Sequence, residues 1–342
     1  MHDRLTLSMR ASHVLAGLLV VCALGLAVVG ALVGDTFYLR LGTEALIFAG
    51  LALSVDLLLG YSGALSLGQA LYFGIGAYVS ALVLMKVPSF WLAMAAAGGA
   101  SFLAALIGGL IANRVRGVYF ALITFGMAQV VAKIVYNTRE LGASDGMIGI
   151  PVIDIGLGPF HVSAGNPVGF FLIVLAVIMG LYALTAYLLD TPFGRVLTAI
   201  KANERRVPFL GYSVWRARMA CYLLAGVIAG LSGALYPMLR GFVSPELMFF
   251  MTSGNAVISV ILGGVGTLVG ALYGSILLII VKSFVGSWTE HHQIVIGALF
   301  MAAVLFFPKG LVGFVRPYVV RALGRPVKEE PPVGLEPGKA KP

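Results

Sequence analysis

The chain has 342 residues, of which 60% are hydrophobic and only 11% are charged, and its mean hydropathy is +1.00. Because about 25% of the residues of a soluble protein are charged, this composition excludes the soluble enzyme folds. The net charge of +9 is gathered in short segments between apolar runs, which is typical of a polytopic membrane protein and disfavours nucleic acid as a partner.

Apolar runs long enough to cross a bilayer follow one another along the chain, and we predict about ten transmembrane helices, within a range of about 8 to 11. They lie at residues 14–33, 45–59, 71–85, 90–112, 117–137, 168–189, 217–238, 250–263, 267–285 and 292–307. The second, third and eighth runs are short and rich in glycine, which indicates broken or re-entrant helices. The fold class is therefore an all-α polytopic membrane protein in which some helices are short or interrupted.

Basic residues predict the orientation, because loops rich in lysine and arginine remain on the cytoplasmic side. Arg4 and Arg10 place the N-terminus inside, and the most basic loop, 190–216, follows six spans and also lies inside. The connection 138–167 carries three acidic residues against one arginine and should be external. Four further spans return the C-terminus to the inside, so we expect both termini to be cytoplasmic.

The domain organisation follows from the same pattern. Residues 1–318 form one transmembrane domain, which includes the cytosolic loop 191–216. Residues 319–342 are rich in proline and charge and have no apolar periodicity, which predicts a disordered cytosolic tail.

Polar side chains at membrane depth mark candidates for a translocation pathway. The segment 60–78, GYSGALSLGQALYFGIGAY, combines glycines with polar residues, and a helix interrupted by glycine is how transporters build polar midplane sites. The alternative is that the serines bond back to carbonyls of their own helix, and the sequence leaves both open. The candidates in this segment are Ser62, Ser66, Gln69 and Tyr72.

Asp56 precedes this segment within an apolar run, where a carboxylate is costly enough to indicate a functional residue. Three roles stay open for it: it faces the pathway, it caps the interrupted helix, or it is protonated in a packed interior. Asn255 is a lesser pathway candidate in the weak eighth run. Lys282 lies toward the outer end of its span, and we expect it to reach the lipid headgroups.

Glycines at four-residue spacing predict faces at which helices pack closely, because small residues let two backbones approach in lipid. The stretch 59–65 is also echoed by 262–268, which indicates either an internal duplication or chance similarity in a glycine-rich chain. The glycines assigned to packing and turns are Gly63, Gly226, Gly230, Gly263, Gly266 and Gly270.

The loop 190–216 contains an amphipathic helix. Thr191 is a suitable N-cap, Pro192 a suitable first residue, and Val196, Leu197 and Ile200 form one apolar face. Such a helix lies on a membrane or inserts its apolar face into the groove of a partner protein. Composition does not separate the two alternatives.

The sequence contains no catalytic constellation. His291 and His292 beside Glu290 do not have the spacing of a zinc site, and Gly338-Lys339 lacks the other residues of a phosphate-binding loop. We therefore expect no enzymatic activity, no bound metal and no cofactor.

Seven segments together resemble the branched-chain amino acid permeases of bacterial ABC importers, most closely the LivM-type subunit. They cover most of residues 45–315 in the family's order. These segments are GYSGALSLGQALYFGIGAY (60–78), GVYFALITFGMAQVV (117–131), DGMIGIP (145–151), TPFGRVLTAIKANE (191–204), FLGYSVWRAR (209–218), AGLSGALY (229–236) and VILGGVGTLVGALYG (260–274).

The resemblance implies a permease subunit in the bacterial inner membrane, which moves substrate with ATP bound and hydrolysed by partner subunits. The implied partners are a second homologous permease, two cytosolic ATP-binding subunits, a periplasmic substrate-binding protein and the lipid bilayer. Branched-chain amino acids are the implied substrate, with urea, short amides or aromatic acids as alternatives within the family. The rivals are an ion-coupled secondary transporter, with Asp56 as its ion site, and a membrane scaffold that transports nothing.

The loop 191–216 matches the family's coupling loop, which contacts the ATPase. The residues that the resemblance assigns to this contact are Gly194, Arg195, Ile200, Glu204 and Gly211. Asp56 stands where the family commonly has asparagine, which implies that a neutral side chain is tolerated there.

Overall fold

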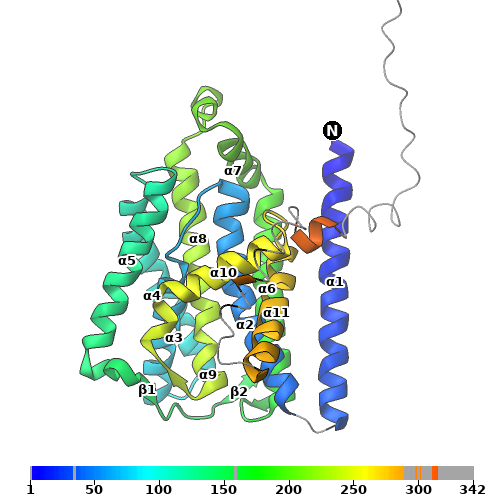
Figure 1. The fold of residues 1–342 in the computed structure, drawn as a ribbon, viewed down its shortest axis with the longest axis vertical. Coiled ribbons are helices and arrows are strands. Elements are labelled where there is room, and N and C mark those ends of the chain that lie inside the picture. The colour runs from blue at the N-terminus through cyan, green and yellow to red at the C-terminus, as the bar shows by residue number, and fades with distance from the viewer. Residues whose placement is uncertain are drawn as a thin grey trace, which may run out of the picture.

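The computed structural model describes residues 2–33, 36–157, 160–288 and 310–314, together with residues 294, 297, 298 and 301. Within these residues, eight helices are long and apolar enough to cross a membrane, with lengths of 18 to 27 residues. A bilayer core requires about 20 apolar helical residues. The predicted all-α polytopic membrane fold is therefore confirmed (Figure 1).

In the part of the chain that the structure describes, the elements are mostly helices, with four short strands. The helices are α1 (His2–Val33), α2 (Thr36–Asp56), α3 (Gln69–Lys86), α4 (Phe90–Ala112), α5 (Val118–Asn137), α6 (Pro167–Asp190), α7 (Pro192–Asn203), α8 (Val214–Ala234), α9 (Tyr236–Arg240), α10 (Phe250–Gly263) and α11 (Val269–Trp288). The strands are β1 (Met147–Ile148), β2 (Asp154–Leu157), β3 (Phe160–Ser163) and β4 (Phe242–Val243). Strand β1 pairs antiparallel with β4, and β2 pairs antiparallel with β3.

Helix α8 is central to the bundle and packs against α2, α3 and α4, whereas α1 lies at its edge (Figure 1). Small residues permit this packing: a Cβ on Gly226 would lie 2.5 Å from that of Ala105, and one on Gly230 would overlap Ser101. Because helices in lipid gain little from burying apolar surface, such close approach, with its many dispersion contacts, holds them together.

The second span was predicted too short. Instead of 45–59 it extends over Thr36–Ser62, 27 residues, because α2 continues into a π-helix, η1 (Leu57–Ser62). Arg40 and Glu44 lowered the local hydropathy and hid its first turns, yet Glu44 forms an ion pair with Arg240 of α9. The third span is also a full 18 residues, and the interruption lies between the two, at residues 63–68, which form no helix.

Helix α10 has 14 residues and is shorter than the eight candidate spans, in agreement with the short, glycine-rich run that predicted it. The last predicted run, 292–307, lies almost wholly outside the described residues. The tail, 319–342, lies wholly outside them. A total of ten spans therefore stays a prediction.

The two ends of the bundle differ in what they carry (Figure 1). The start of α1 lies at the end that carries α7, whereas α9, β1 and β2 lie at the opposite end. This arrangement agrees with the expectation that the N-terminus and the basic loop share one side of the membrane. That this side is cytoplasmic remains a prediction.

Candidate transport pathway and coupling loop

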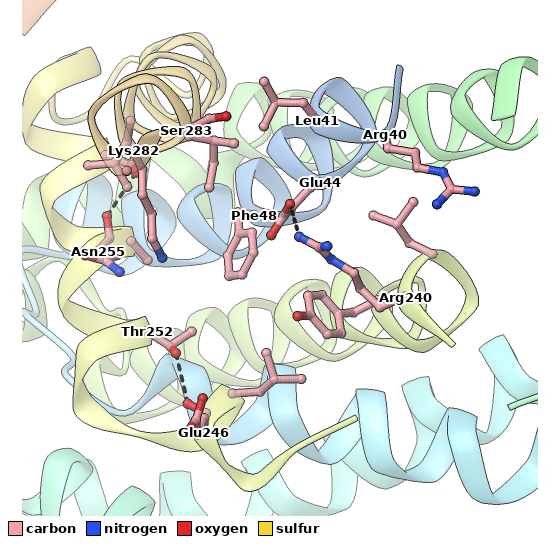
Figure 2. Close-up of a pocket in the computed structure, with 18 of the residues that line it drawn as sticks. Arg40, Leu41, Glu44, Phe48, Arg240, Glu246, Thr252, Asn255, Lys282 and Ser283 are labelled. Carbon is pink, nitrogen blue, oxygen red and sulfur yellow. Dashed lines mark hydrogen bonds and ion pairs between the residues drawn. The ribbon is translucent and has the colours of Figure 1, made fainter. Parts of the chain in front are cut away.

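A cavity of about 880 Å³ opens between α2, α9, α10 and α11 (Figure 2). Its walls come from the first half of α2 and the last half of α11, toward the end of the bundle opposite to α7. Polar and charged side chains contribute much of the lining: Arg40, Glu44, Arg240, Ser244, Glu246, Thr252, Asn255, Ser259, Lys282 and Ser283. Charged groups at membrane depth are costly unless they meet water, so we call this cavity the vestibule and take it as the candidate pathway.

The charges of this vestibule are only partly paired. Arg240 donates a hydrogen bond to the Glu44 carboxylate, and the two form an ion pair across the cavity (Figure 2). Arg40, Glu246 and Lys282 belong to none of the ion pairs found within the described residues. Among the described lining residues, three cations stand against two anions, which leaves one surplus positive charge.

Lys282 corrects one expectation. Its side chain was expected to extend to the lipid headgroups, yet Lys282 lines the vestibule and points into it together with Asn255 of α10 (Figure 2). Asn255 is the predicted pathway candidate that the structure places in the cavity wall. The others, Asp56, Ser62, Ser66, Gln69 and Tyr72, are buried and lie away from this wall.

Most polar side chains near the interruption bond to backbone groups. Ser62 Oγ donates to the Leu58 carbonyl at 2.8 Å, which is the local bond that the alternative hypothesis described. The amides of Leu67 and Ala70 donate to Thr124 Oγ1 and Ser253 Oγ at 3.2 and 3.1 Å. The first amides of a helix have no partner within it, so these hydroxyls stabilise the start of α3.

Ser66, Gln69 and Tyr72 take part in three further hydrogen bonds near the start of α3. Ser66 Oγ accepts from the Gly68 amide at 3.3 Å and from Gln69 Nε2 at 3.4 Å. The hydroxyls of Tyr72 and Tyr222 share a hydrogen bond of 2.8 Å. Gln69 Oε1 is buried and has no hydrogen-bond partner among the described residues. The side-chain carbonyl oxygen of Gln69 is therefore free to accept a hydrogen bond within the described part of this segment.

Asp56 has a structural position that the sequence did not specify. Its side chain is fully buried, with Oδ1 accepting from the Gly266 amide at 2.6 Å and Oδ2 accepting from the Leu268 amide at 2.9 Å. Both amides belong to the turn that precedes α11, where the partial positive charge of the helix N-terminus favours an anion. Asp56 thus caps α11 and not the interrupted helix in which it lies.

The two echoed segments meet at this point. Gly63 and Gly266 occupy matching positions and both have a left-handed backbone, with φ of 72° and 78°. A Cβ on Gly60 would lie 2.6 Å from the Gly266 Cα, so the two turns pack backbone against backbone. A Cβ on Gly263 would overlap the Gly270 carbonyl, which explains why α10 and α11 approach so closely.

Helix α7 turns its apolar face inward. Leu197 is fully buried and Ile200 is 3% exposed, and α7 packs against η1 and α6 of its own chain. Leu197 and Ile200 are therefore not available to lipid or to a partner's groove, whereas Val196 of the same face is half-buried and lines a surface groove. Contact of this loop with an ATPase stays a prediction. Gly194 permits the packing, because a Cβ there would overlap the backbone of Leu189.

Glu204 also contacts its own chain. It forms ion pairs with Arg116 Nε at 3.2 Å and with Arg218 Nη2 at 3.0 Å, which join the loop to the α4–α5 connection and to α8. Gly211 then ends the 3₁₀ turn 204–210 with a left-handed φ of 80°. Glu204 and Gly211 thus fix the shape of the loop.

Among the described residues, an exposed apolar apex follows α7. Phe209 is 90% exposed, and Leu210, Tyr212 and Trp215 are also exposed. Beside them, Arg195 lines a groove of about 310 Å³ together with Val207 and Leu210. Our sequence interpretation missed this apex because it followed the helical periodicity of residues 192–200; the signal was the apolar pair Phe209-Leu210 within a basic loop.

We predict that Glu204→Gln loosens this loop. Loss of both ion pairs should make chymotrypsin cleave after Phe209 about fivefold faster, because such a network contributes about 1 kcal/mol. Limited proteolysis of the purified protein measures this rate. Arg205→Gln, which changes an exposed neighbour, is the matched control, and equal cleavage of both variants would contradict the assignment.

Comparison with known proteins defines the class. The sequence model of the family described as "Branched-chain amino acid transport system / permease component" matches residues 37–304, from the first turn of α2 onward. The chain belongs to this permease family and is a multi-pass inner membrane protein.

Its relatives specify the type of subunit. The chain is 27% identical to the high-affinity branched-chain amino acid transport system permease protein LivM of Salmonella typhimurium, over 85% of this chain and 73% of the relative. It is 27% identical to LivM of Escherichia coli K12, over 81% and 70% of the two chains, and 23% identical to the LivH permease of the same strain, over 78% and 91%. The predicted LivM-type resemblance is thereby confirmed. No solved structure matches this chain significantly.

Proposed function

We propose that the chain is the permease subunit of an ABC importer for branched-chain amino acids, which receives substrate from a periplasmic binding protein. It pairs with a second, homologous permease and with two cytosolic subunits that bind and hydrolyse ATP, and it carries out no covalent chemistry itself. The observation that supports this most directly is the position of the vestibule. It lies toward one end of the bundle, while the exposed apex of residues 209–215 lies at the other.

The vestibule suits a zwitterionic substrate. Lys282 and Arg40 attract a carboxylate, Glu246 attracts an ammonium group, and Phe48 and Leu278 provide apolar wall for an aliphatic side chain. Urea and short amides carry no charge and would form no ion pair with these groups. Amino acids are therefore favoured over urea and short amides.

The ion-coupled rival is disfavoured by the surroundings of Asp56. Each carboxylate oxygen accepts a backbone amide, and the side chain does not line the vestibule. A coupling cation would have to displace these bonds, so Asp56 is poorly placed as an ion site.

Reconstitution tests the proposal. In proteoliposomes that contain both permeases, the ATPases and the binding protein, leucine uptake should require ATP. This chain alone, under a proton or sodium gradient, should take up none. Uptake by the chain alone, or uptake by the complex without ATP, would contradict the proposed function.

We predict that Lys282→Met lowers leucine uptake by roughly tenfold or more, because a hydrogen bond to a charged group contributes about 1.5–3 kcal/mol. Lys282→Arg should retain most uptake. Lys133→Met serves as a control, because Lys133 lies outside the vestibule wall. Equal uptake by the Lys282→Met and Lys133→Met proteins would remove Lys282 from the pathway.

A further inference from the structure

A lysine joins the loop helix α7 to the interrupted helix. Lys201 Nζ donates to the Gly60 carbonyl at 2.6 Å, although 141 residues separate the two positions in the chain. Gly60 lies in the last turn of η1, where carbonyls lack helical amide partners. The stem of Lys201 also covers Gly63, because a Cβ there would lie 3.1 Å from Lys201 Cγ. The ammonium group therefore has a defined position at the end of η1.

The far side of the same turn contacts the helices that line the vestibule. Gly60 packs on Gly266, since a Cβ on Gly60 would lie 2.6 Å from the Gly266 Cα and from the Gly266 nitrogen. Asp56, one turn before Gly60, accepts from the amides of Gly266 and Leu268. The turn 264–268 joins α10 to α11, and both helices supply vestibule wall.

We propose that Lys201, Gly60, Asp56 and Gly266 form a mechanical link that transmits movement of the loop helix to the vestibule. This inference rests on the proposed function, in which ATP binding by a partner moves the loop. Each step is a direct contact: ammonium to carbonyl, glycine backbone to glycine backbone, and carboxylate to two amides. Lys201 acts as a positioning residue in this link and touches no substrate.

The arrangement suits transmission better than simple packing. The π-helix η1 is held on one side by the Lys201 ammonium group of α7, and its neighbour Asp56 binds the α10–α11 turn on the other. Close-packed backbones have no side-chain rotamers with which to absorb a displacement. A shift of α7 therefore displaces the turn 264–268 and with it the starting point of α11. Coupling of two sites requires an element that both of them bias, and η1 with this turn is that element.

The test separates transmission from folding by measuring two quantities: ATP hydrolysis by the complex and the accessibility of the vestibule wall. A single cysteine is placed at Ser283, in the vestibule wall, after Cys22 and Cys221 have been replaced by serine and alanine. The complete transport complex is labelled with a membrane-impermeant maleimide, with and without ATP and vanadate. In the complex with Lys201 intact, nucleotide trapping should change the labelling rate.

Lys201→Met should keep basal ATP hydrolysis and the labelling rate without nucleotide, but the change on trapping should fall by roughly tenfold, as expected for loss of a charge-assisted hydrogen bond. Lys201→Arg should restore most of the change. Arg206→Met removes a charge from an exposed position of the same loop and should behave as the unsubstituted complex. If Lys201→Met assembles poorly, Lys201→Gln, whose side chain is shorter, replaces it.

The outcomes distinguish the link from the proposed function. A change in labelling that persists in full in Lys201→Met or Lys201→Gln overturns the link alone, provided that the unsubstituted complex shows ATP-dependent leucine uptake. Absence of that uptake, and of any effect of trapping, overturns the proposed function together with the link. Loss of the change in Arg206→Met as well would assign the effect to loop charge and would also overturn the link.

Discussion

Replacement of Gly230 by leucine is expected to abolish accumulation of the folded protein in the membrane. Gly230 lies where α8 crosses α4 and α3, and even a single Cβ there would overlap the Ser101 side chain. Overpacking of a close-packed interior costs about 1–3 kcal/mol per side chain and more where backbones are in contact. The Tyr72 carbonyl, which accepts from Ser101 Oγ, lies at the same crossing, so α3 would be displaced too.

Fluorescence-detected size-exclusion chromatography of a tagged protein measures this effect as the height of the monodisperse peak. Gly180→Leu is the matched control, because Gly180 is also a glycine in a transmembrane helix, but a Cβ there would have no atom of a neighbouring element within 4 Å. We expect the control to give a normal peak. A normal peak for Gly230→Leu would show that α8 has more room than this packing allows.

Hydropathy and charge predicted the helices well because both depend on solvent rather than on partners. A membrane span must satisfy its backbone internally and expose apolar side chains, so the runs near α4, α5 and α6 follow from composition alone. The first turns of α2 were missed because they depend on a partner elsewhere in the chain. Glu44 reduces the local hydropathy, and its partner Arg240 is 196 residues away in the chain.

The function of the glycine-rich turns required the fold. The sequence showed that residues 59–65 and 262–268 are similar, but not that Gly60 rests on Gly266. Likewise, the amphipathic pattern of α7 was correct as a pattern, yet the apolar face packs on η1 of the same chain. Periodicity identifies which side chains will be buried, and it carries no information about which surface buries them.

The pathway candidates show the same limit. Asn255 and Lys282 meet in one vestibule because α10 and α11 pack against each other beside α2. Ser62, Ser66 and Asp56 are equally polar, but each of them forms a hydrogen bond to a backbone group. Polarity at membrane depth therefore detects two kinds of residue, those that face water and those that complete an interrupted helix, and the sequence alone does not separate them.

Asp56→Leu is expected to eliminate transport by destabilising the turn between α10 and α11. Without the carboxylate, the Gly266 and Leu268 amides lose their acceptor, and each unsatisfied buried amide costs about 1–3 kcal/mol. Leucine has the same branched skeleton of heavy atoms and a larger volume, so it leaves no cavity, and the loss of the two acceptors is what removes the cap. The measurements are the thermal stability of the purified protein and leucine uptake by the complex, and we expect both to be severely reduced.

Asp56→Asn is the informative comparison, because its carbonyl oxygen still accepts one of the two amides while its amino group faces the other. We expect intermediate stability and retained uptake, in agreement with the family resemblance, which places asparagine at this position. The order of stability should therefore be aspartate, then asparagine, then leucine, with transport lost only at the last. If Asp56→Asn assembled at normal levels and transported nothing, the negative charge itself would be required, and the ion-coupled mechanism would replace the capping role argued from the two amides.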